Sequence, residues 1–388
     1  MFIARHRSVV LSALACLALA GCSTATERPA TASPWPSALH DARHSGVSSS
    51  AGPTTGRIRW QRKLEDAVVP GPVIGGDGTI YVSSNAGILH AIDPATGNDR
   101  WTYDSHATQP DSDLSVSPLV LPSGEILFPT PGTDLVALSP TGDELWRQPL
   151  PGRPTSPVTT NGSRVYVGDE TGDVSAIDLT GDGKPKIAWK VNAGAGSYAS
   201  VVTNGSGAVY TTSGTSLVAI ADHGASASIA WRADPQDGDT EVSAGLAPDG
   251  TVLLGTNGTQ EWAYRPDGSP LWHSPRVITY SSPSVTATGL AYVADHTGTV
   301  RVFDTRTGTQ RRTYRPAKTE IWSSTVLDKD SRVYFGGQNG HVYGLSPTGA
   351  VLFDVALGAP IDSYPALTAD GALIVGAANG TVAAIESY

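Results

Sequence analysis

Six of the nine tryptophans in this chain of 388 residues fall at the same place in a repeated stretch of sequence. Each copy runs from a small residue and a proline, through short apolar stretches separated by glycine turns, to a Thr-Gly or Asp-Gly turn and the tryptophan. Two further aromatic residues extend the series at the same period. The eight anchors, 39 to 45 residues apart, are Trp60, Trp101, Trp146, Trp189, Trp231, Trp272, Tyr314 and Phe353.

A period of about 40 to 50 residues with several strands per copy is typical of a β-propeller blade, which buries its faces only by stacking on neighbouring blades. Valine, isoleucine and tyrosine alternate with small or polar residues as strands require, and Asp-Gly and Asn-Gly pairs supply tight turns. The residue that opens each innermost strand also occurs eight times: Pro72, Pro118, Pro157, Ser200, Ala244, Pro283, Thr325 and Pro365. The sequence therefore predicts an all-β fold, a single eight-bladed β-propeller of four-stranded blades over residues 54–388.

The two ends of the repeat indicate how the ring closes. The last copy stops at Tyr388 after three strands without an anchor, whereas Trp60 stands near the start without three strands of its own. An open ring would leave unpaired strand edges, and closure removes them. We therefore expect residues 56–64 to supply the fourth strand of the last blade. A set of separate β-sandwiches is the rival all-β interpretation, and the uniform period and the split copy favour the propeller.

Residues 1–21 have the pattern of an export signal. Two arginines precede an apolar run at 9–20 that is too short to span a membrane. Leu19-Ala20-Gly21-Cys22 resembles the lipobox of bacterial lipoproteins, which implies a lipid attached at Cys22 and a cell-envelope location. The alternative is an ordinary secretory signal cut near the same place. Cys16 is the other cysteine of the chain, so the exported part has no disulfide and no cysteine-ligated metal site.

Residues 22–53 are expected to form a lipid-anchored tether and a lead-in segment. The first part is small, polar and contains proline, as in a flexible tether. The stretch from Trp35 to Gly46 carries an aromatic residue and several specific polar groups, so we expect it to be docked on the ring. Within it, His40 and His44 are four residues apart, and we interpret them as a surface pair rather than as metal ligands because no third ligand is near.

The charge of the chain limits the partners that it can have. The net charge is −10, and removal of residues 1–21 takes away Arg5 and Arg7 and leaves −12. Such a charge argues against a surface for nucleic acid or anionic lipid. We expect a monomer without a nucleic-acid partner, attached to the plasma membrane's outer face, or to the outer membrane's inner leaflet in a Gram-negative cell, through its lipid alone.

The repeat resembles that of the PQQ-like (pyrroloquinoline quinone) propellers, on the Tyr-Val-Gly, Gly turn, Ala-Ile-Asp, Thr-Gly and terminal Trp that recur over residues 56–388. This family contains quinoprotein alcohol dehydrogenases and non-enzymatic, BamB-like lipoproteins. The resemblance implies that each aromatic anchor docks on the next blade and has a structural role. It also implies that an enzyme of this family would need a cysteine pair, a calcium site, a catalytic Asp and long insertions over the quinone.

The enzyme interpretation lacks support in the sequence. The chain has no cysteine after Cys22 and every repeat is close to the same length, which leaves no insertion to cover a quinone. Nucleophile-elbow, phosphate-loop and His-Glu-x-x-His motifs do not occur. Residues 178–183 alternate oxygen side chains around glycine, but Lys186 stands where a calcium loop has an acid, so a hairpin turn is favoured. We expect no catalysis, cofactor or bound metal; a quinoprotein dehydrogenase is the alternative.

Function in propellers is carried by loops on a face of the ring, because the scaffold strands cannot vary freely. The two longest loops, over 102–116 and 232–242, are acidic, which suits a basic partner or a cation, although acidic loops are common on an acidic protein. Aromatic residues before the inner strands favour recognition, and Tyr364 replaces the small residue that the other seven copies place beside the axis. The candidate binding residues are Asp104, His106, Asp111, Asp113, Asp234, Asp237, Asp239, Glu241, Trp322 and Tyr364. The expected function is a protein-binding scaffold of the cell envelope, including outer-membrane protein assembly.

Overall fold

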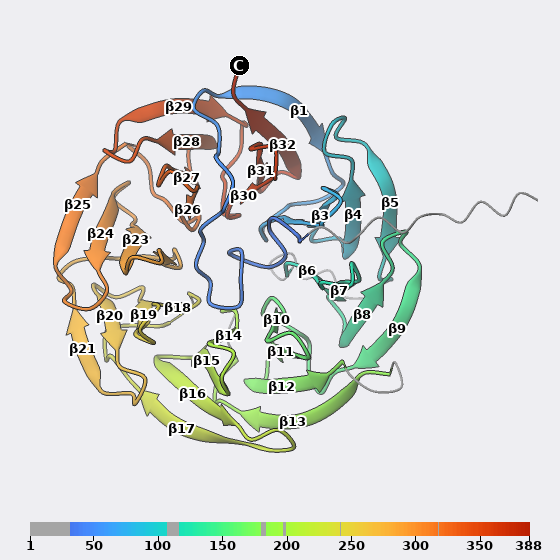
Figure 1. The fold of residues 1–388 in the computed structure, drawn as a ribbon, viewed down its shortest axis with the longest axis vertical. Coiled ribbons are helices and arrows are strands. Elements are labelled where there is room, and N and C mark those ends of the chain that lie inside the picture. Colours follow the sequence, from blue (N-terminus) through green and yellow to red (C-terminus); the bar gives the residue numbers. More distant parts are fainter. Residues whose placement is uncertain (1–31, 107–115, 180–183, 197–198, 241, 317) are drawn as a thin grey trace, which may run out of the picture.

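The computed structural model describes residues 32–106, 116–179, 184–196, 199–240, 242–316 and 318–388, and these form eight four-stranded antiparallel sheets and no helix. The sheets stand round a common axis, with the two-residue strands innermost and the long strands at the rim (Figure 1). The prediction of a single eight-bladed, all-β propeller is confirmed.

Blades 1 to 7 take their strands in chain order from the axis to the rim, and blade 8 takes β1 (Arg57–Lys63) as its outermost strand. Blade 1 consists of β2 (Val73–Ile74), β3 (Ile80–Ser83), β4 (Ile88–Ile92) and β5 (Asp99–Asp104). Blade 2 consists of β6 (Leu119–Val120), β7 (Ile126–Pro129), β8 (Asp134–Leu138) and β9 (Glu144–Pro149). Blade 3 consists of β10 (Thr159–Thr160), β11 (Arg164–Gly168), β12 (Asp173–Asp178) and β13 (Lys186–Asn192). Blade 4 consists of β14 (Val202–Thr203), β15 (Ala208–Ser213), β16 (Ser216–Asp222) and β17 (Ala227–Ala233).

The second half of the ring repeats this order. Blade 5 consists of β18 (Gly245–Leu246), β19 (Val252–Gly255), β20 (Glu261–Tyr264) and β21 (Pro270–His273). Blade 6 consists of β22 (Ser284–Val285), β23 (Leu290–Ala294), β24 (Val300–Asp304) and β25 (Gln310–Tyr314). Blade 7 consists of β26 (Val326–Leu327), β27 (Val333–Gly336), β28 (His341–Leu345) and β29 (Val351–Ala356). Blade 8 consists of β30 (Ala366–Leu367), β31 (Leu373–Gly376), β32 (Thr381–Glu386) and β1 (Arg57–Lys63).

Blade 8 joins the two ends of the chain, as the sequence predicted. Strand β1 pairs antiparallel with β32, with Arg57 opposite Glu386 and Lys63 opposite Thr381. Arg59 donates to Glu386, and the backbone N–H of Tyr388 donates to Thr55 Oγ1 at 2.9 Å. The fourth strand of blade 8 therefore comes from the opposite end of the sequence, and this pairing closes the ring between the last blade and the first.

The core lies between the blades. Val73 and Leu89 of blade 1, for example, pack with Val120 and Phe128 of blade 2, and equivalent apolar clusters separate the other neighbours. A blade alone would leave both of these faces in water, so the ring is stable only as a whole.

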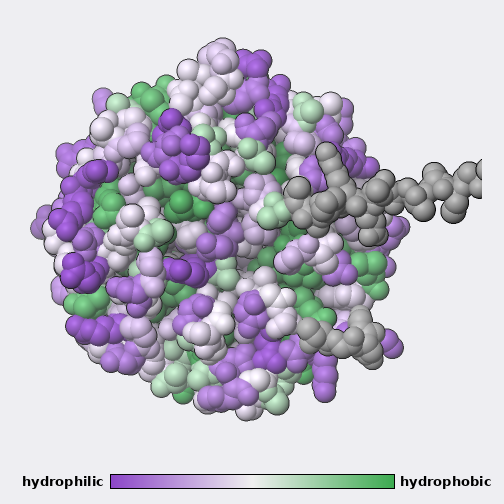
Figure 2. All heavy atoms as spheres, viewed as in Figure 1, coloured by the Kyte–Doolittle hydropathy of each residue, from purple (hydrophilic) through white to green (hydrophobic). Residues whose placement is uncertain are grey.

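The strand order defines two faces of the ring. The turns between the first and second and between the third and fourth strands of each blade lie on one face, which we call the turn face. The turns between second and third strands, and the loops from one blade to the next, lie on the other, which we call the loop face. On the face viewed in Figure 2, hydrophilic residues cover most of the rim and hydrophobic residues form small separate patches. A binding site on such a surface has to be sought in grooves and clusters.

Candidate functional site

The lead-in, residues 32–53, closes the axis on the turn face (Figure 1). In six blades the second residue of the innermost strand donates its backbone N–H to a lead-in carbonyl at 2.7 to 3.1 Å. The donors are Ile74, Val120, Thr203, Leu246, Val285 and Leu327, and the acceptors are Trp35, Pro36, Ala42, Arg43, Ser45 and Gly46. Trp35 is fully buried, as expected for a docked segment.

Asp41 holds the turn of the lead-in near the axis. Its carboxylate accepts the backbone N–H groups of Arg43 and Ser45 at 2.9 and 3.1 Å and the Ser45 hydroxyl at 2.6 Å. Burial raises the pKa of Asp41, but hydrogen bonds from His40 and Ser45 outweigh burial and hold the pKa well below its usual range. His44 is buried rather than on the surface, and its burial lowers its pKa to about 4. This carboxylate and this imidazole therefore have a structural role.

The described parts of the two acidic loops lie on the loop face, three blades apart. Asp104 accepts the backbone N–H of His106 at 2.7 Å, and both side chains are largely exposed. Asp234 accepts the Thr215 hydroxyl at 3.1 Å and the backbone N–H of Gln236 at 2.8 Å. Asp111, Asp113 and Glu241 lie outside the described residues, and no contact joins the two loops in the part of the chain that the structure covers.

The Asp237 carboxylate is hydrogen-bonded to neighbouring residues rather than free in solvent. Its carboxylate accepts the Thr256 hydroxyl at 2.9 Å and both the N–H and the hydroxyl of Thr259 at 3.0 to 3.1 Å. The backbone N–H of Asp239 donates to Asn257 at 2.7 Å. These bonds tie residues 237–239, in the loop between blades 4 and 5, to the second-to-third turn of blade 5.

Trp322 belongs to an aromatic cluster on the loop face between blades 6 and 7. Its indole is 39% exposed, packs edge-on against Tyr280 at 5.5 Å and stacks on His296 at 6.0 Å between ring centroids. Tyr280 and His296 are 4.7 Å apart, and exposed Ile278 accepts the backbone N–H of His296 at 3.0 Å. The sequence did not single out His296, because only the fold brings it from a second-to-third turn to two inter-blade loops.

A belt of small hydroxyl residues surrounds the axis near the loop face. The backbone N–H of Ser200 donates to Ser243, that of Ser243 to Ser282 and that of Ser282 to Ser324, at 2.8 to 3.1 Å. Each serine thus links one blade to the next where bulky residues would collide.

Tyr364 is the bulky member of this belt. Its ring lies against Gly71 of blade 1, where an added Cβ would overlap it, and its hydroxyl meets the Ser117 hydroxyl of blade 2. Burial raises the pKa of Tyr364. The side chain therefore spans two neighbouring blades along the wall of the axis.

The aromatic anchors contact the next blade round the ring. Trp60 donates its indole N–H to the Pro94 carbonyl at 2.8 Å, and its ring lies 2.7 Å from where a Cβ of Gly97 would be. Trp101, Trp231, Trp272 and Tyr314 repeat this arrangement with Pro140, Pro266, Thr305 and Pro347. Trp189 donates instead to Asp222, and Trp146 and Phe353 pack in apolar clusters. These residues hold blades together and do not form a ligand site.

Glu261 is a residue that the sequence analysis missed. It is fully buried in β20, neither carboxyl oxygen has a hydrogen-bond partner among the described residues, and burial raises its pKa to about 8. Glu261 pairs with Gly255. In each of the other seven blades, the equivalent position on the third strand holds an apolar residue. The equivalents are Leu89, Leu135, Val174, Leu217, Val300, Val342 and Val382. Alignment of the eight repeats would have revealed it.

The described residues contain no group of three or more His, Cys, Asp or Glu side chains placed to hold a metal ion. None of their segments forms a helix long and apolar enough to cross a membrane.

A family model described as outer membrane protein assembly factor BamB matches residues 43–120 and 106–227. BamB of Nitrosomonas eutropha is 33% identical over 128 residues, which make up 32% of this chain and 29% of that protein. Quinohemoprotein alcohol dehydrogenase of Comamonas testosteroni is 32% identical over 120 residues, 29% of this chain and 17% of the enzyme. Protein Rv3035 of Mycobacterium tuberculosis is 24% identical over 166 residues, 41% of this chain and 39% of that protein. The chain thus spans well under half the length of these relatives.

Solved structures agree on the fold. BamB of Moraxella catarrhalis superimposes with a TM-score of 0.69 at 14% identity, covering 85% of this chain and 99% of BamB. The Comamonas testosteroni dehydrogenase superimposes with a TM-score of 0.73 at 15% identity, covering 90% of this chain and 80% of the enzyme. Together with the closed eight-bladed ring, these matches show that the chain is a β-propeller with PQQ-like repeats, similar in sequence and in fold to BamB.

Proposed function

We propose that this protein is a non-catalytic, lipid-anchored scaffold of the cell envelope that binds a protein partner through its loop face. The observation that carries the proposal is the likeness to BamB, an outer membrane protein assembly factor, both in the family model and in a solved structure that this chain covers almost completely. Envelope or outer-membrane protein assembly is the role that this likeness favours.

The loop face supplies groups that suit a protein partner. The cluster of Tyr280, His296 and Trp322 offers rigid aromatic surface beside exposed Ile278, and aromatic residues are enriched where protein interfaces gain most of their binding energy. The braced loop that carries Asp237 adds acidic groups to this face. An anchored ring would present both to a partner in the envelope.

Capture from crosslinked membranes tests this surface. The full chain should enrich a specific partner, and Trp322→Ala should reduce that capture several-fold, because it removes the most exposed ring of the cluster. Leu145→Ala is the matched control, since Leu145 is 48% exposed on the outer strand of blade 2, away from the loop face. Equal capture by the wild type and both variants would contradict the role of the loop face.

The anchor is tested separately. Cys22→Ser should abolish incorporation of labelled palmitate and release the protein from the membrane fraction. A variant that stays membrane-bound without label would show that another part of the chain holds it there.

A quinoprotein alcohol dehydrogenase is the second candidate, because a quinohemoprotein alcohol dehydrogenase is among the relatives by sequence and by fold. Purified protein mixed with the quinone and calcium, then desalted, should show no quinone absorbance and no dye-linked alcohol oxidation. Retained quinone together with turnover would replace the scaffold proposal with the enzyme.

A further inference from the structure

The lead-in demonstrates how this ring holds an extended chain. After crossing the axis, it passes between blades 7 and 8, where the Tyr334 hydroxyl donates to the Pro53 carbonyl at 3.1 Å. Gly52 packs on the Tyr334 ring so closely that an added Cβ would lie 2.6 Å from the hydroxyl oxygen. On the other side of the passage, the Ala51 carbonyl touches Gly371 of blade 8. A radial groove of the turn face therefore accepts a peptide backbone.

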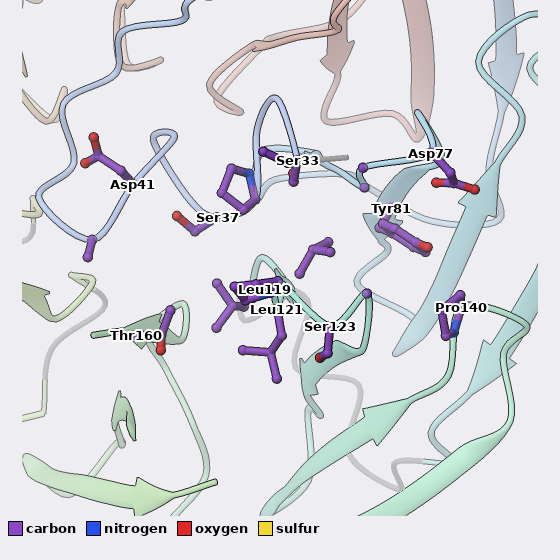
Figure 3. Close-up of a pocket in the computed structure, with 18 residues that line it drawn as sticks. Ser33, Ser37, Asp41, Asp77, Tyr81, Leu119, Leu121, Ser123, Pro140 and Thr160 are labelled. Carbon is purple, nitrogen blue, oxygen red and sulfur yellow. The ribbon is translucent and has the colours of Figure 1, made fainter. Parts of the chain in front are cut away.

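The equivalent groove between blades 1 and 2 is a cavity of about 660 Å³ (Figure 3). Tyr81 takes the place of Tyr334 in its blade, and Gly124 takes the place of Gly371. Figure 3 shows Leu119 and Leu121 between Tyr81 and the lead-in. The walls are mainly apolar and contain three prolines: Pro36, Pro122 and Pro140.

Thr160 of blade 3 lies at the axial end of this cavity. The backbone N–H of Asn161 donates to the Arg164 carbonyl at 3.1 Å, so Thr160 and Val165 form the next, non-hydrogen-bonded pair of the ladder. The N–H of Thr160 therefore points away from β11 and toward the axis, as the six donors that meet lead-in carbonyls do. Among the described residues no carbonyl accepts it.

Leu367 of blade 8 is the other innermost position without such a bond in the part of the chain that the structure covers, but it is fully buried. Thr160, by contrast, is partly exposed in the cavity. A buried or half-buried backbone donor gains stability from a partner. At this place in the repeat, the protein itself uses a peptide carbonyl for that purpose.

The comparable groove between blades 4 and 5 differs from the groove between blades 1 and 2 in its volume and in the charge of its lining. There Tyr210 takes the place of Tyr81, and the cavity shrinks to about 370 Å³. The Arg43 side chain of the lead-in lines it and donates to the Leu246 carbonyl at 3.1 Å. No charged side chain of this length reaches into the groove between blades 1 and 2 from the described lead-in.

The two carboxylates at the rim of the first groove already have partners. Asp77 accepts hydrogen bonds from Thr79 and Arg100 at 2.7 and 2.8 Å, and Asp41 binds Ser45 and Arg43 as described above. These carboxylates are therefore satisfied within the protein. The apolar walls and the Thr160 N–H therefore match a peptide better than a charged or sugar-like ligand.

We propose that the groove between blades 1 and 2 binds an extended, uncharged, proline-containing peptide segment of a partner protein, which places a backbone carbonyl on the Thr160 N–H and apolar side chains against Leu119 and Leu121. This mode combines main-chain hydrogen bonding with side-chain pockets. It goes beyond the proposed function, whose aromatic cluster lies on the opposite face, and the two can fail separately.

The probe is a capped peptide with the sequence of residues 49–55, which contains the stretch that occupies the equivalent groove, together with a version that carries Ala51→Leu to fill the apolar walls. Binding to the full chain is followed by NMR titration and amide hydrogen exchange. We expect saturable binding, tighter for the leucine version, and exchange at Thr160 that slows at least 5-fold when the probe binds. The six amides that meet lead-in carbonyls should exchange slowly throughout.

Two pairs of variants locate the probe. Ser123 is exposed at the edge of the groove, and Ser123→Trp should weaken binding at least 10-fold, whereas Asp249→Trp, the same position in the groove between blades 4 and 5, should leave it unchanged. Tyr81→Phe and Tyr210→Phe form a milder pair, in which only the first should weaken binding.

Three results would overturn the proposal. Slow exchange at Thr160 in the free full chain would mean that residues upstream of Ala32 already occupy the groove. Dissociation of a dimer by the probe would make a second copy of this chain the occupant. Equal effects within each pair of variants, or no binding of either peptide, would exclude this groove, while capture that depends on Trp322 would still stand.

Discussion

At the scale of single residues, Glu261 is the position where one blade departs from the pattern of the other seven. A carboxyl that is fully buried without a partner stays protonated, because burial penalises its charged form. The residues around Glu261 explain why its charged form is penalised so strongly. A Cβ on Gly255 would lie 3.2 Å from Glu261 Oε2, 2.5 Å from the Thr279 methyl group and 3.3 Å from Val242, so the carboxyl has apolar surroundings.

Glu261 should make the protein less stable as the pH rises. Its pKa is about 8 in the folded protein against an ordinary value of 4.5, so between these values the folded state binds a proton that the unfolded state has lost. The free energy of unfolding then falls with pH, by roughly 4 kcal/mol at most over this window. Denaturant unfolding of the wild type and of Glu261→Leu at pH 5, 6.5 and 8 measures the effect.

The difference in free energy of unfolding between the wild type and Glu261→Leu reports on Glu261 alone, because both proteins contain the other titratable groups, such as His44. We expect Glu261→Leu, which restores the residue type of the other blades, to be the more stable protein at pH 8 and the gap to shrink toward pH 5. Glu261→Gln serves as a control of similar shape. A gap independent of pH would show that the carboxyl is ionised in the folded protein.

Residue-level roles were only partly predictable. The anchors follow from spacing alone, because each occupies one place in a uniform repeat. Asp237 looked like a free acid in the sequence, yet the structure engages it with Thr256 and Thr259. Such partners depend on how two loops meet, which no spacing within one loop reveals.

At the scale of the strand, each outer strand contains the same irregularity in its pairing. In all eight blades the pairing of the third and fourth strands shifts by one residue. In seven of them the shift comes just before the anchor, as between Ile58 and Trp60, and in blade 6 it comes before Arg312, two residues ahead of Tyr314. A β-bulge of this kind bends the strand and re-aims the next side chain. Here it directs the anchor onto the glycine turn of the next blade, a geometry that the periodic sequence did not disclose.

Substitution by alanine should destabilise the protein more at a glycine that packs against an anchor than at a glycine in an open turn. Gly268 and Gly224 have φ of +85° and +87°, so alanine at either costs about 1 kcal/mol of backbone strain. A Cβ at Gly268 would also lie 2.6 Å from the Trp231 ring, whereas nothing lies within 4 Å at Gly224. Gly268→Ala should therefore cost about 1 to 3 kcal/mol more in denaturant unfolding. Equal losses would mean that the anchor moves aside freely.

At the scale of the whole molecule, the ring and its lead-in are one structure. The number of blades and the closure in blade 8 could be predicted from the period and the ends of the repeat, and the docking of the lead-in from Trp35 and the polar groups that follow it. The route of the lead-in was not, because its contacts are backbone bonds that leave no trace in side-chain patterns. That route decides which radial grooves are filled and which remain open.

Closure of the ring should control its stability, because blade 8 depends on residues from both ends of the chain. Arg57 and Glu386 lie directly opposite each other in β1 and β32, and a disulfide between cysteines at these positions would close a loop of nearly the whole propeller. A control pair at Ala221 and Ser228, opposite each other in one hairpin of blade 4, closes a loop of a few residues. The chain-entropy model gives about 5 to 6 kcal/mol for the first and about 2 to 3 kcal/mol for the second.

Denaturant midpoints of the two oxidised proteins, each against its reduced form, test this comparison. We expect the pair in blade 8 to raise the midpoint clearly more than the pair in the hairpin, because only the first prevents β1 from leaving β32 and opening the ring. Similar gains would mean that the ring unfolds from a blade other than the eighth, and the closing strand would then have no special place in its stability.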